Sequence, residues 1–474
     1  MLLFSFLRRR LKQMPLWKIH GPPAVSFLTG NHAQMYHVGA AQFHEHIMKI
    51  YGRVIRVTGF LWDTVLLISD PKACATILGD QEMFEETDWF IESSLAVFGP
   101  GLFGTLGAHH RKQRKQLNPV FSVKQVRCMT PLFHNITSQA RPLSDILHAK
   151  AIAGPQEVDM IDWFGRVALE LIAQGGLGHT LADTMHRHTR AVFDEKKARL
   201  ERGDDVFKQQ LNEGKDIISV LMQKNSGAEE EDRLPDEEIL AQMSSLVFAA
   251  TDTTSTALSR ILYLLAQHPD VQETLRAEIN DAHVRTGEPE LGFDALFELP
   301  YLEAVCRETL RVFPPPSYVS RVARADTSLP LSRPIDTDGG AVSSLYVPRG
   351  TTVGISILGV NRDPSIWGAD AAEWKPARWL APLPDSVAAA RVPGLYANTL
   401  TFLGGGRSCI GFKFAQLEMK VVLSRLISAF RFSPSEREIV WRFGGLTTPS
   451  VKGSTVMAPQ LPMILERVKG WPRL

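Results

Sequence analysis

The chain has little cysteine, no excess charge of either sign and no long apolar run, and these shortages exclude several classes of protein. Four cysteines lie far apart among 474 residues, which is typical of a reducing compartment and not of a disulfide scaffold. The formal net charge is +1, so the chain lacks the excess of basic residues expected of a nucleic-acid-binding protein. No Ser/Gly tract, charge block or internal repeat marks a linker or an array. Length alone would allow two or three domains, and 44% hydrophobic residues are ample for a large core.

The N-terminus begins with a short apolar run that basic residues follow. Residues 1–7 are mostly apolar, and residues 8–10 are all arginine. This run cannot cross a bilayer, which needs about 20 residues. A cleaved signal peptide would place its charges before the apolar run. Two interpretations of residues 1–20 stay open: a shortened anchor that lies against anionic headgroups, or a disordered start.

A glycine-rich turn at residues 402–411, with the sequence FLGGGRSCIG, holds one cysteine. An amphipathic helix is predicted to follow it, from Phe412 to about Phe430. The glycines let the backbone approach a flat cofactor and leave amide N–H groups to point at the sulfur. The N-terminus of the helix favours a thiolate. This layout is expected of a haem whose iron is held by cysteine, with Arg407 reaching an acidic group on the cofactor rim.

Other interpretations of this turn are less favourable. A lone buried cysteine is usually an inert small hydrophobe, but chance poorly explains a ten-residue ordered string. Zinc is excluded because no second Cys or His stands nearby at ligand spacing. A phosphate-binding loop would need Lys followed by Ser or Thr after its glycines, and this sequence has Arg-Ser-Cys.

The turn resembles the haem-binding loop of the cytochrome P-450 superfamily, F-x-x-G-x-R-x-C-x-G. Phe402, Gly405, Arg407, Cys409 and Gly411 occupy every fixed position of that pattern. The resemblance implies that Cys409 is the axial thiolate ligand of the iron in haem b, and that Phe402 and Arg407 bind the cofactor. It also implies a mostly α fold, a single large helical haem-thiolate domain with a small β-rich N-terminal lobe.

A long apolar helix is predicted to begin at Pro235 and to end near His268. Its centre, residues 249–254, reads AATDTT. Thr and Asp are poor helix-interior residues, and a Thr hydroxyl bonded to the carbonyl four residues earlier can bend or open a helix. The string resembles the family's oxygen-binding signature, with alanine at position 250 where glycine is commoner. The resemblance implies that Asp252 and Thr253 are the acid–alcohol pair that delivers protons during dioxygen use.

Glu308 and Arg311 are predicted to share one face of a helix. By itself such a pair is usually exposed and contributes well under about 1 kcal/mol. Its flanks are apolar here, which favours a buried pair that needs a third partner. Residues 376–379 resemble the family's P-x-R-W segment, so Arg378 is expected to complete the network. Its implied role is structural.

The carboxylates on a haem rim need cations or hydrogen-bond donors. The resemblance assigns this role to His110, Arg114, Arg321 and Arg407, with His110 standing where tryptophan is common. In isolation, the basic cluster at residues 109–115 is more often a solvated face. The other basic residues expected around the cysteine side of the haem would form a docking face for an acidic redox partner. They are Arg111, Lys112, Lys115 and Lys413.

The region near residues 178–235 is shorter than the resemblance implies. Relatives carry two further helices here that form a lid over the substrate. Only one charged helical stretch, near residues 184–202, and a short segment at 215–218 fit this pattern. The lid is therefore expected to be reduced. Either the site is unusually open, or the chain is an impaired product of splicing or truncation.

These observations predict that residues 21–474 form a cytochrome P-450-type monooxygenase. It would insert one oxygen atom from O2 into a lipophilic substrate, with electrons from NADPH passed on by NADPH–cytochrome P-450 reductase. The implied substrate pocket draws on residues 90–103, 248–249, 317–319 and 444–446, which are mostly apolar. The sequences of residues 118–122 and 248–252 most resemble those of family members from fungal secondary-metabolite clusters. Many of those members hydroxylate terpenoids.

The predicted location is the cytosolic face of the endoplasmic reticulum membrane, by peripheral association, with a soluble protein as the alternative. Two other functions stay open. A haem-thiolate isomerase or dehydratase would need no dioxygen, and the intact Asp252–Thr253 pair argues against it. A haem-binding protein impaired by a truncated lid has the missing lid as its only support.

Overall fold

The computed structural model describes residues 11–139, 154–177, 193–194, 196–199, 202 and 216–468. Helices dominate this part of the chain and the strands are short, so the predicted mostly α fold class is confirmed. The chain divides into two compact units. Unit 1 contains Met1–Phe90, Arg307–Cys409 and Trp441–Thr448, and unit 2 contains Ile91–Cys306, Ile410–Val440 and Pro449–Leu474.

Unit 1 is built on a five-stranded sheet whose strands come from two distant parts of the sequence. Its strand order is β1 (Val54–Thr58), β2 (Thr64–Ile68), β8 (Thr352–Ser356), β5 (Tyr318–Ala323) and β3 (Phe84–Glu85). The first two strands form the hairpin that their alternating residues predict. The lobe is β-rich as expected, but it is not confined to the N-terminal sequence, because β5 and β8 complete the sheet. A separate hairpin joins β6 (Thr327–Thr337) and β7 (Gly340–Val347).

Short helices cover this sheet in unit 1. They are α2 (His32–Tyr36), α3 (Ala40–Tyr51), α4 (Pro71–Gly79), α18 (Ile357–Asn361), α19 (Pro364–Trp367) and α20 (Asp385–Ala390). Helix α4 begins where its sequence predicts, because the Asp70 carboxylate accepts hydrogen bonds from the N–H groups of Lys72 and Ala73. The last turns of α17 (Pro300–Val312) also belong to unit 1.

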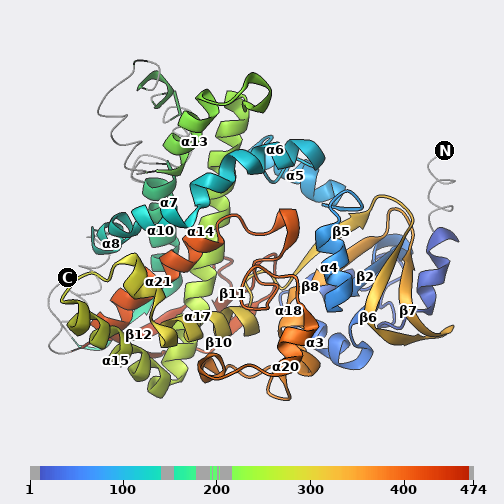
Figure 1. Cartoon of the computed structure of the whole chain (residues 1–474). Helices are drawn as coiled ribbons and strands as arrows, with labels where there is room; N and C mark the ends of the chain where they lie inside the picture. The colour runs from blue at the N-terminus through green and yellow to red at the C-terminus, as the bar shows by residue number, and fades with distance from the viewer. Residues whose placement is uncertain are drawn as a thin grey trace. The chain divides into compact units, whose positions relative to one another are not determined.

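Unit 2 is organised around the long helix α14 (Asp236–Gln267). It follows Pro235 and has three acidic residues in its first turn, as its sequence predicts. Helix α14 packs against α10 (Met160–Leu171) and α21 (Phe412–Ala429) (Figure 1). The other helices of this unit are α6 (Gly107–Leu117), α7 (Val123–Cys128), α8 (Thr130–Gln139), α13 (Ile217–Ser226), α15 (Pro269–Thr286) and α16 (Phe293–Phe297). A small sheet has the order β4 (Gln156–Asp159), β12 (Pro462–Arg467), β9 (Phe430–Pro434).

Most of the expected lid region, and the apolar start of the chain at residues 1–10, lie outside the described residues. Within the described part, residues 193–194 and 196–199 are helical. The Lys196 ammonium lies 2.9 Å from a carboxylate oxygen of Asp216 and 2.7 Å from the hydroxyl of Ser219. All three residues are buried, so this ion pair holds residues 196–199 against the start of α13. No helix among the described residues is long and apolar enough to cross a membrane.

Candidate active site

The turn that carries Cys409 is closed by its own backbone hydrogen bonds. The Cys409 N–H donates to the Phe402 carbonyl at 2.9 Å, and the Ser408 N–H donates to the Gly405 carbonyl at 3.2 Å. The short helix η8 (Gly405–Arg407) lies between these contacts, and α21 begins three residues after the cysteine. The Phe402 ring meets the edge of the Tyr396 ring, with 5.7 Å between centroids. The turn is therefore a fixed platform for the thiol.

The glycines of this turn are required by neighbouring backbone. A Cβ atom at Gly404 would overlap the Pro393 carbonyl oxygen, and one at Gly405 would overlap the Leu78 carbonyl oxygen. Gly405 also has φ +67°, a conformation that other residues rarely adopt. The sequence-based interpretation attributed the glycines to close approach of a cofactor. The structure adds a reason from packing that no local pattern reveals.

The four cysteines differ in accessibility. Cys74 and Cys306 are buried, and burial raises the pKa of both thiols, to about 12 for Cys306. Cys306 therefore serves packing. Cys409 is exposed, and so is Cys128, which ends α7 outside any glycine-rich turn. An exposed thiol two residues from Arg407 is the donor arrangement that fits a haem iron and a carboxylate on the haem rim.

Two of the predicted haem arginines in unit 1 share an acidic neighbour. Arg321 on β5 is only 4% exposed, and its Nη1 donates to Oε2 of Glu86 at 2.6 Å. Burial raises the pKa of Glu86, while the positive charges of Arg321 and Arg407 lower it in part. The structure thus places both arginines close to one carboxylate. Sequence reasoning missed Glu86, which directly follows β3 in the structure.

The other two residues predicted to bind the haem carboxylates lie on α6 in unit 2. His110 is buried and Arg114 is half-buried. They are four residues apart on one helix, so they occupy the same face. The expected docking face is altered at Lys115, whose ammonium lies 2.7 Å from Asp232. This pairing raises the pKa of Lys115 and leaves its charge partly compensated. Lys413 lies over the Phe412 ring at 4.8 Å.

The threonines of α14 bond to the helix backbone as predicted. The Thr251 hydroxyl donates to the Val247 carbonyl at 2.8 Å, and the Thr253 hydroxyl donates to the Ala249 carbonyl at 2.7 Å. Helix α14 continues through this stretch, so the expected opening of the helix is not observed. Asp252 is exposed to solvent, yet partial desolvation raises the pKa of its carboxyl. That direction suits a group that passes on protons.

A second carboxyl in unit 2 was missed by sequence reasoning. Glu418 on α21 has no exposed surface, and burial raises its pKa to about 8. The Thr254 hydroxyl, which faces it, lowers that pKa in part. Thr254 directly follows Thr253 on α14. The signal in the sequence was an acidic residue between Leu417 and Met419 in the amphipathic helix predicted after the cysteine.

The predicted ion network in unit 1 is present and fully buried. Both Glu308 and Arg311 have no exposed side-chain surface, and Arg311 donates to the two carboxylate oxygens of Glu308 at 2.7 and 2.8 Å. Arg378 adds a third charge at 3.2 Å. Backbone carbonyls of Asn361 and Ala371 accept the remaining hydrogen bonds of Arg311. The network therefore ties α17 to the segments around residues 361–378.

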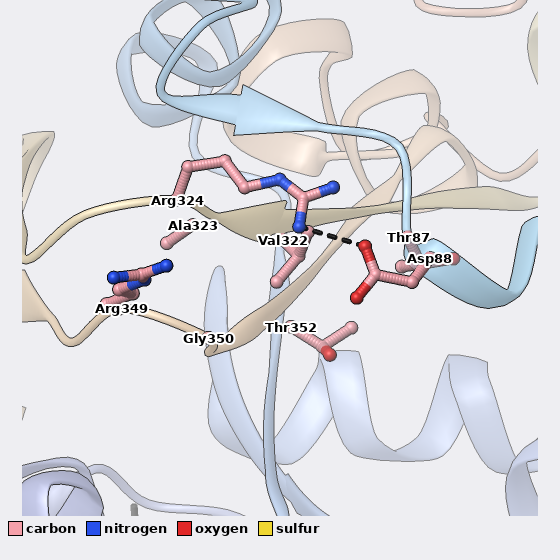
Figure 2. A pocket seen from close by; sticks show the side chains of 8 residues that line it. All are labelled: Thr87, Asp88, Val322, Ala323, Arg324, Arg349, Gly350 and Thr352. Atoms are coloured by element: carbon pink, nitrogen blue, oxygen red, sulfur yellow. Dashed lines mark ion pairs between the residues drawn. The ribbon is translucent and has the colours of Figure 1, made fainter. Parts of the chain in front are cut away.

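A recess of about 370 Å³ in unit 1 has a different lining from the predicted site (Figure 2). Its residues are Thr87, Asp88, Val322, Ala323, Arg324, Arg349, Gly350 and Thr352. Arg324 reaches across to Asp88 at 2.9 Å (Figure 2). It also donates to Glu85 at 2.6 Å. None of the predicted haem or proton-delivery residues lines it, and its central cation is already paired. The recess is therefore not a candidate for the haem.

Comparisons with known proteins identify the family. The family model named Cytochrome P450 matches residues 20–181 and 175–455, so the chain belongs to the cytochrome P450 family. Cytochrome P450 monooxygenase 91 of Postia placenta is 43% identical over 519 aligned residues, covering 96% of this chain and 94% of that protein. Ganoderic acid synthetase CYP5150L8 of Ganoderma lucidum is 37% identical, covering 94% and 93%.

Several predictions are confirmed by this membership. The chain is a cytochrome P450-type monooxygenase, and its cofactor is haem held by a cysteine thiolate. Such enzymes use O2, a small-molecule substrate and a redox partner. The relatives are fungal, as the wording of the sequence indicated.

Proposed function

We propose that this enzyme hydroxylates a lipophilic, terpenoid-like substrate with electrons from NADPH delivered by NADPH–cytochrome P-450 reductase. The observation that carries the site is the Cys409 turn, where an exposed thiol stands two residues from Arg407 on a platform closed by backbone hydrogen bonds. In this proposal Cys409 would hold the iron through its thiolate. The haem carboxylates would be bound by His110, Arg114, Arg321 and Arg407, and Phe402 would contact the cofactor.

The haem, when bound, supplies the oxygen-activating chemistry. The residues of α14 then handle protons. Asp252 has a pKa raised by desolvation, so it is protonated more readily than an ordinary aspartate. The Thr253 hydroxyl hydrogen is engaged with the Ala249 carbonyl, which leaves the hydroxyl oxygen able to accept a hydrogen bond. This pair can therefore accept protons from solvent and pass them on.

An aromatic cluster supports the lipophilic substrate. Phe98, at the end of α5 (Asp88–Phe98), lies 4.9 Å from the Phe248 ring and 6.0 Å from the Phe103 ring. Phe248, on α14 five residues before Thr253, keeps 51% of its surface exposed. An exposed aromatic wall beside the proton-handling residues fits an apolar molecule. The relative named ganoderic acid synthetase supports a fungal small molecule as the substrate.

Peripheral association with the endoplasmic reticulum membrane is part of the same proposal. Phe60 and Trp62 in the β1–β2 turn are 54% and 45% exposed, and Phe27, whose ring meets Trp62, is 74% exposed. Aromatic side chains of this kind favour the lipid–water interface. The basic residues 8–10 would add attraction to anionic headgroups.

The reduced lid also stays a proposal. The two family-model segments overlap at residues 175–181, and the aligned length of 519 residues exceeds the chain's 474. The aligned length shows that the alignment contains gaps, and the meeting of the two family-model segments at residues 175–181 supports a gap near the lid.

The test is spectroscopic and then catalytic. The reduced protein with carbon monoxide should show the red-shifted Soret band of thiolate ligation, and Cys409→Ala should lose it completely. Cys128→Ala is the matched control, since Cys128 is the other exposed thiol and should keep the band. A band that survives Cys409→Ala would remove the ligand assignment.

Activity with the reductase separates the remaining alternatives. NADPH consumption that depends on a lipophilic substrate and yields a hydroxylated product supports the monooxygenase proposal. Substrate turnover without NADPH or O2 would indicate an isomerase or dehydratase. If the carbon monoxide band is normal but NADPH oxidation yields only peroxide and no hydroxylated product, the protein is impaired by its truncated lid.

A further inference from the structure

Glu86 stands opposite Arg321 in the sheet of unit 1. Strand β3 pairs antiparallel with β5, with Phe84 opposite Ala323 and Glu85 opposite Val322. The next step of that register brings residue 86 level with Arg321. Their side chains meet there, with 2.6 Å between Oε2 of Glu86 and Nη1 of Arg321. Cross-strand neighbours of opposite charge are held by the sheet itself, so this pair has a fixed geometry.

Both members of this pair are removed from water. The side chains of Glu86 and Arg321 are 11% and 5% exposed. Two charges are buried only when each is compensated, and Arg321 alone would be a costly buried cation. Arg407, two residues before Cys409, adds a second positive charge that acts on Glu86. The Glu86 carboxylate is therefore close to Arg321 and Arg407. These are the two arginines of unit 1 that the proposed function assigns to the haem carboxylates.

We propose that Glu86 is a resident counter-ion of the haem-binding arginines, which keeps a buried negative charge beside the cofactor and lowers its reduction potential. This inference rests on the proposed function, because it requires Arg321 and Arg407 to hold the haem carboxylates. A nearby anion stabilises the more positive ferric state over the ferrous state, and the effect is large where water is excluded. Glu86 acts through the arginines and through its charge, so it is a positioning residue.

The other charged groups around Glu86 are accounted for by different partners. Arg324 contacts the backbone carbonyl of Glu86 at 3.3 Å, and its side chain is paired with Glu85 and Asp88. Arg321 from β5 donates a hydrogen bond to the Glu86 carboxylate. The positive charge of Arg407 from η8 also acts on this carboxylate. Among the described residues that act on this position, Glu86 is therefore the acid whose protonation changes the charge next to the two haem arginines.

A dependence on pH follows from this geometry. Burial raises the pKa of Glu86 above that of an ordinary glutamate, and two further anionic groups on the haem would act in the same direction. Protonation removes the negative charge, so the reduction potential should rise as the pH falls. That rise should begin at a pH above the range where an ordinary glutamate titrates.

The experiment is a spectroscopic redox titration of the haem-loaded full-length protein at several pH values between 5 and 8. Glu86→Gln keeps the shape and the hydrogen-bond acceptor but removes the charge. It should have a more positive midpoint potential than the wild type at pH 8, and should lose most of the wild-type change with pH. Glu86→Asp keeps the charge and should stay near the wild type. Glu85→Gln is the matched control, because Glu85 is the neighbouring acid and is paired with Arg324.

Each outcome separates this inference from the proposed function. A Glu86→Gln potential equal to the wild type at every pH would overturn the counter-ion role, and so would an equal shift in Glu85→Gln. A wild-type potential that does not change with pH would overturn it without any variant, which covers the case where Glu86→Gln fails to bind haem. Absence of the thiolate-type carbon monoxide band in the wild type would overturn the proposed function itself.

Discussion

Two glutamates with no exposed surface, Glu308 and Glu418, have very different surroundings. The carboxylate of Glu308 receives two hydrogen bonds from Arg311 and one each from Arg378, the Trp379 indole and the Lys375 backbone, all within 3.2 Å. Glu418 faces the Thr254 hydroxyl, and burial raises its pKa to about 8. Both acids stand in apolar stretches of helix, so their sequence patterns are alike.

The difference shows that compensation, and not burial alone, decides what a buried acid does. A carboxylate surrounded by cations and donors holds segments together, which is the part Glu308 takes in unit 1. A carboxyl with few donors is favoured in its neutral form, so Glu418 carries a proton at pH 7 next to the polar stretch of α14 in unit 2. Perturbed groups of the second kind cluster at functional sites.

Breaking the compensation of Glu308 should have the largest effect. Arg311→Met removes two charge-assisted hydrogen bonds to Glu308 and leaves a buried carboxylate short of donors. The free energy of unfolding should fall by about 3–5 kcal/mol. Little haem-loaded protein should accumulate, as measured by haem absorbance per unit of chain and by urea unfolding of what remains. The matched control is Arg166→Met, because the pair of Arg166 with Asp162 is exposed and should change stability by less than about 0.5 kcal/mol. Equal losses in both variants would contradict the comparison.

Much of unit 1's network could be predicted because its signals are local. Glu308 and Arg311 are three residues apart on one helix, and their apolar flanks indicate burial. The Cys409 turn and the hydrogen bonds of the α14 threonines to the helix backbone were also predicted from short sequence motifs, residues 402–411 and 249–254. Helix starts followed the same logic, as the caps at Asp70 and Pro235 show.

What could not be predicted depends on contacts between distant parts of the chain. Glu86 meets Arg321 and Lys115 meets Asp232 across large sequence separations, with no pattern linking either pair. The glycines of the cysteine turn are required by carbonyls of Leu78 and Pro393, which only the folded structure brings against them. Glu418 was visible as a residue, but its altered pKa comes from packing around α21.

The polar stretch of α14 offers the next test, because two of its threonines make the same backbone contact. Thr253→Ala should keep haem content but divert NADPH from product to peroxide, with product formation falling on the order of a hundredfold. Thr251→Ala loses an equivalent hydrogen bond to the carbonyl four residues earlier, yet it should keep its coupling close to the wild type. Product and peroxide measured together for each NADPH would check this. The same loss of coupling in both variants would mean that the effect is structural.

The last test concerns Glu418, whose effect on stability depends on pH. The unfolded chain ionises this carboxyl at an ordinary glutamate pKa, whereas the folded chain keeps it protonated until about pH 8. The folded state therefore binds the extra proton between these two values. Its stability is greatest below the unfolded pKa and is lost as the pH rises toward 8.

Glu418→Gln should remove this loss, because an amide does not titrate. Between pH 5 and pH 8 the wild type should lose about 3.5 kcal/mol that the variant keeps. The amide is itself a buried polar group that needs partners, so absolute stability is a poor readout and the change with pH is the informative one. Unfolding of haem-loaded protein at pH 5, 6, 7 and 8 measures it, with Glu436→Gln on the exposed surface as the control for loss of an acid. If wild type and Glu418→Gln lose stability in parallel over this range, the carboxyl of Glu418 is compensated by its surroundings as that of Glu308 is, and the two acids do not differ as argued.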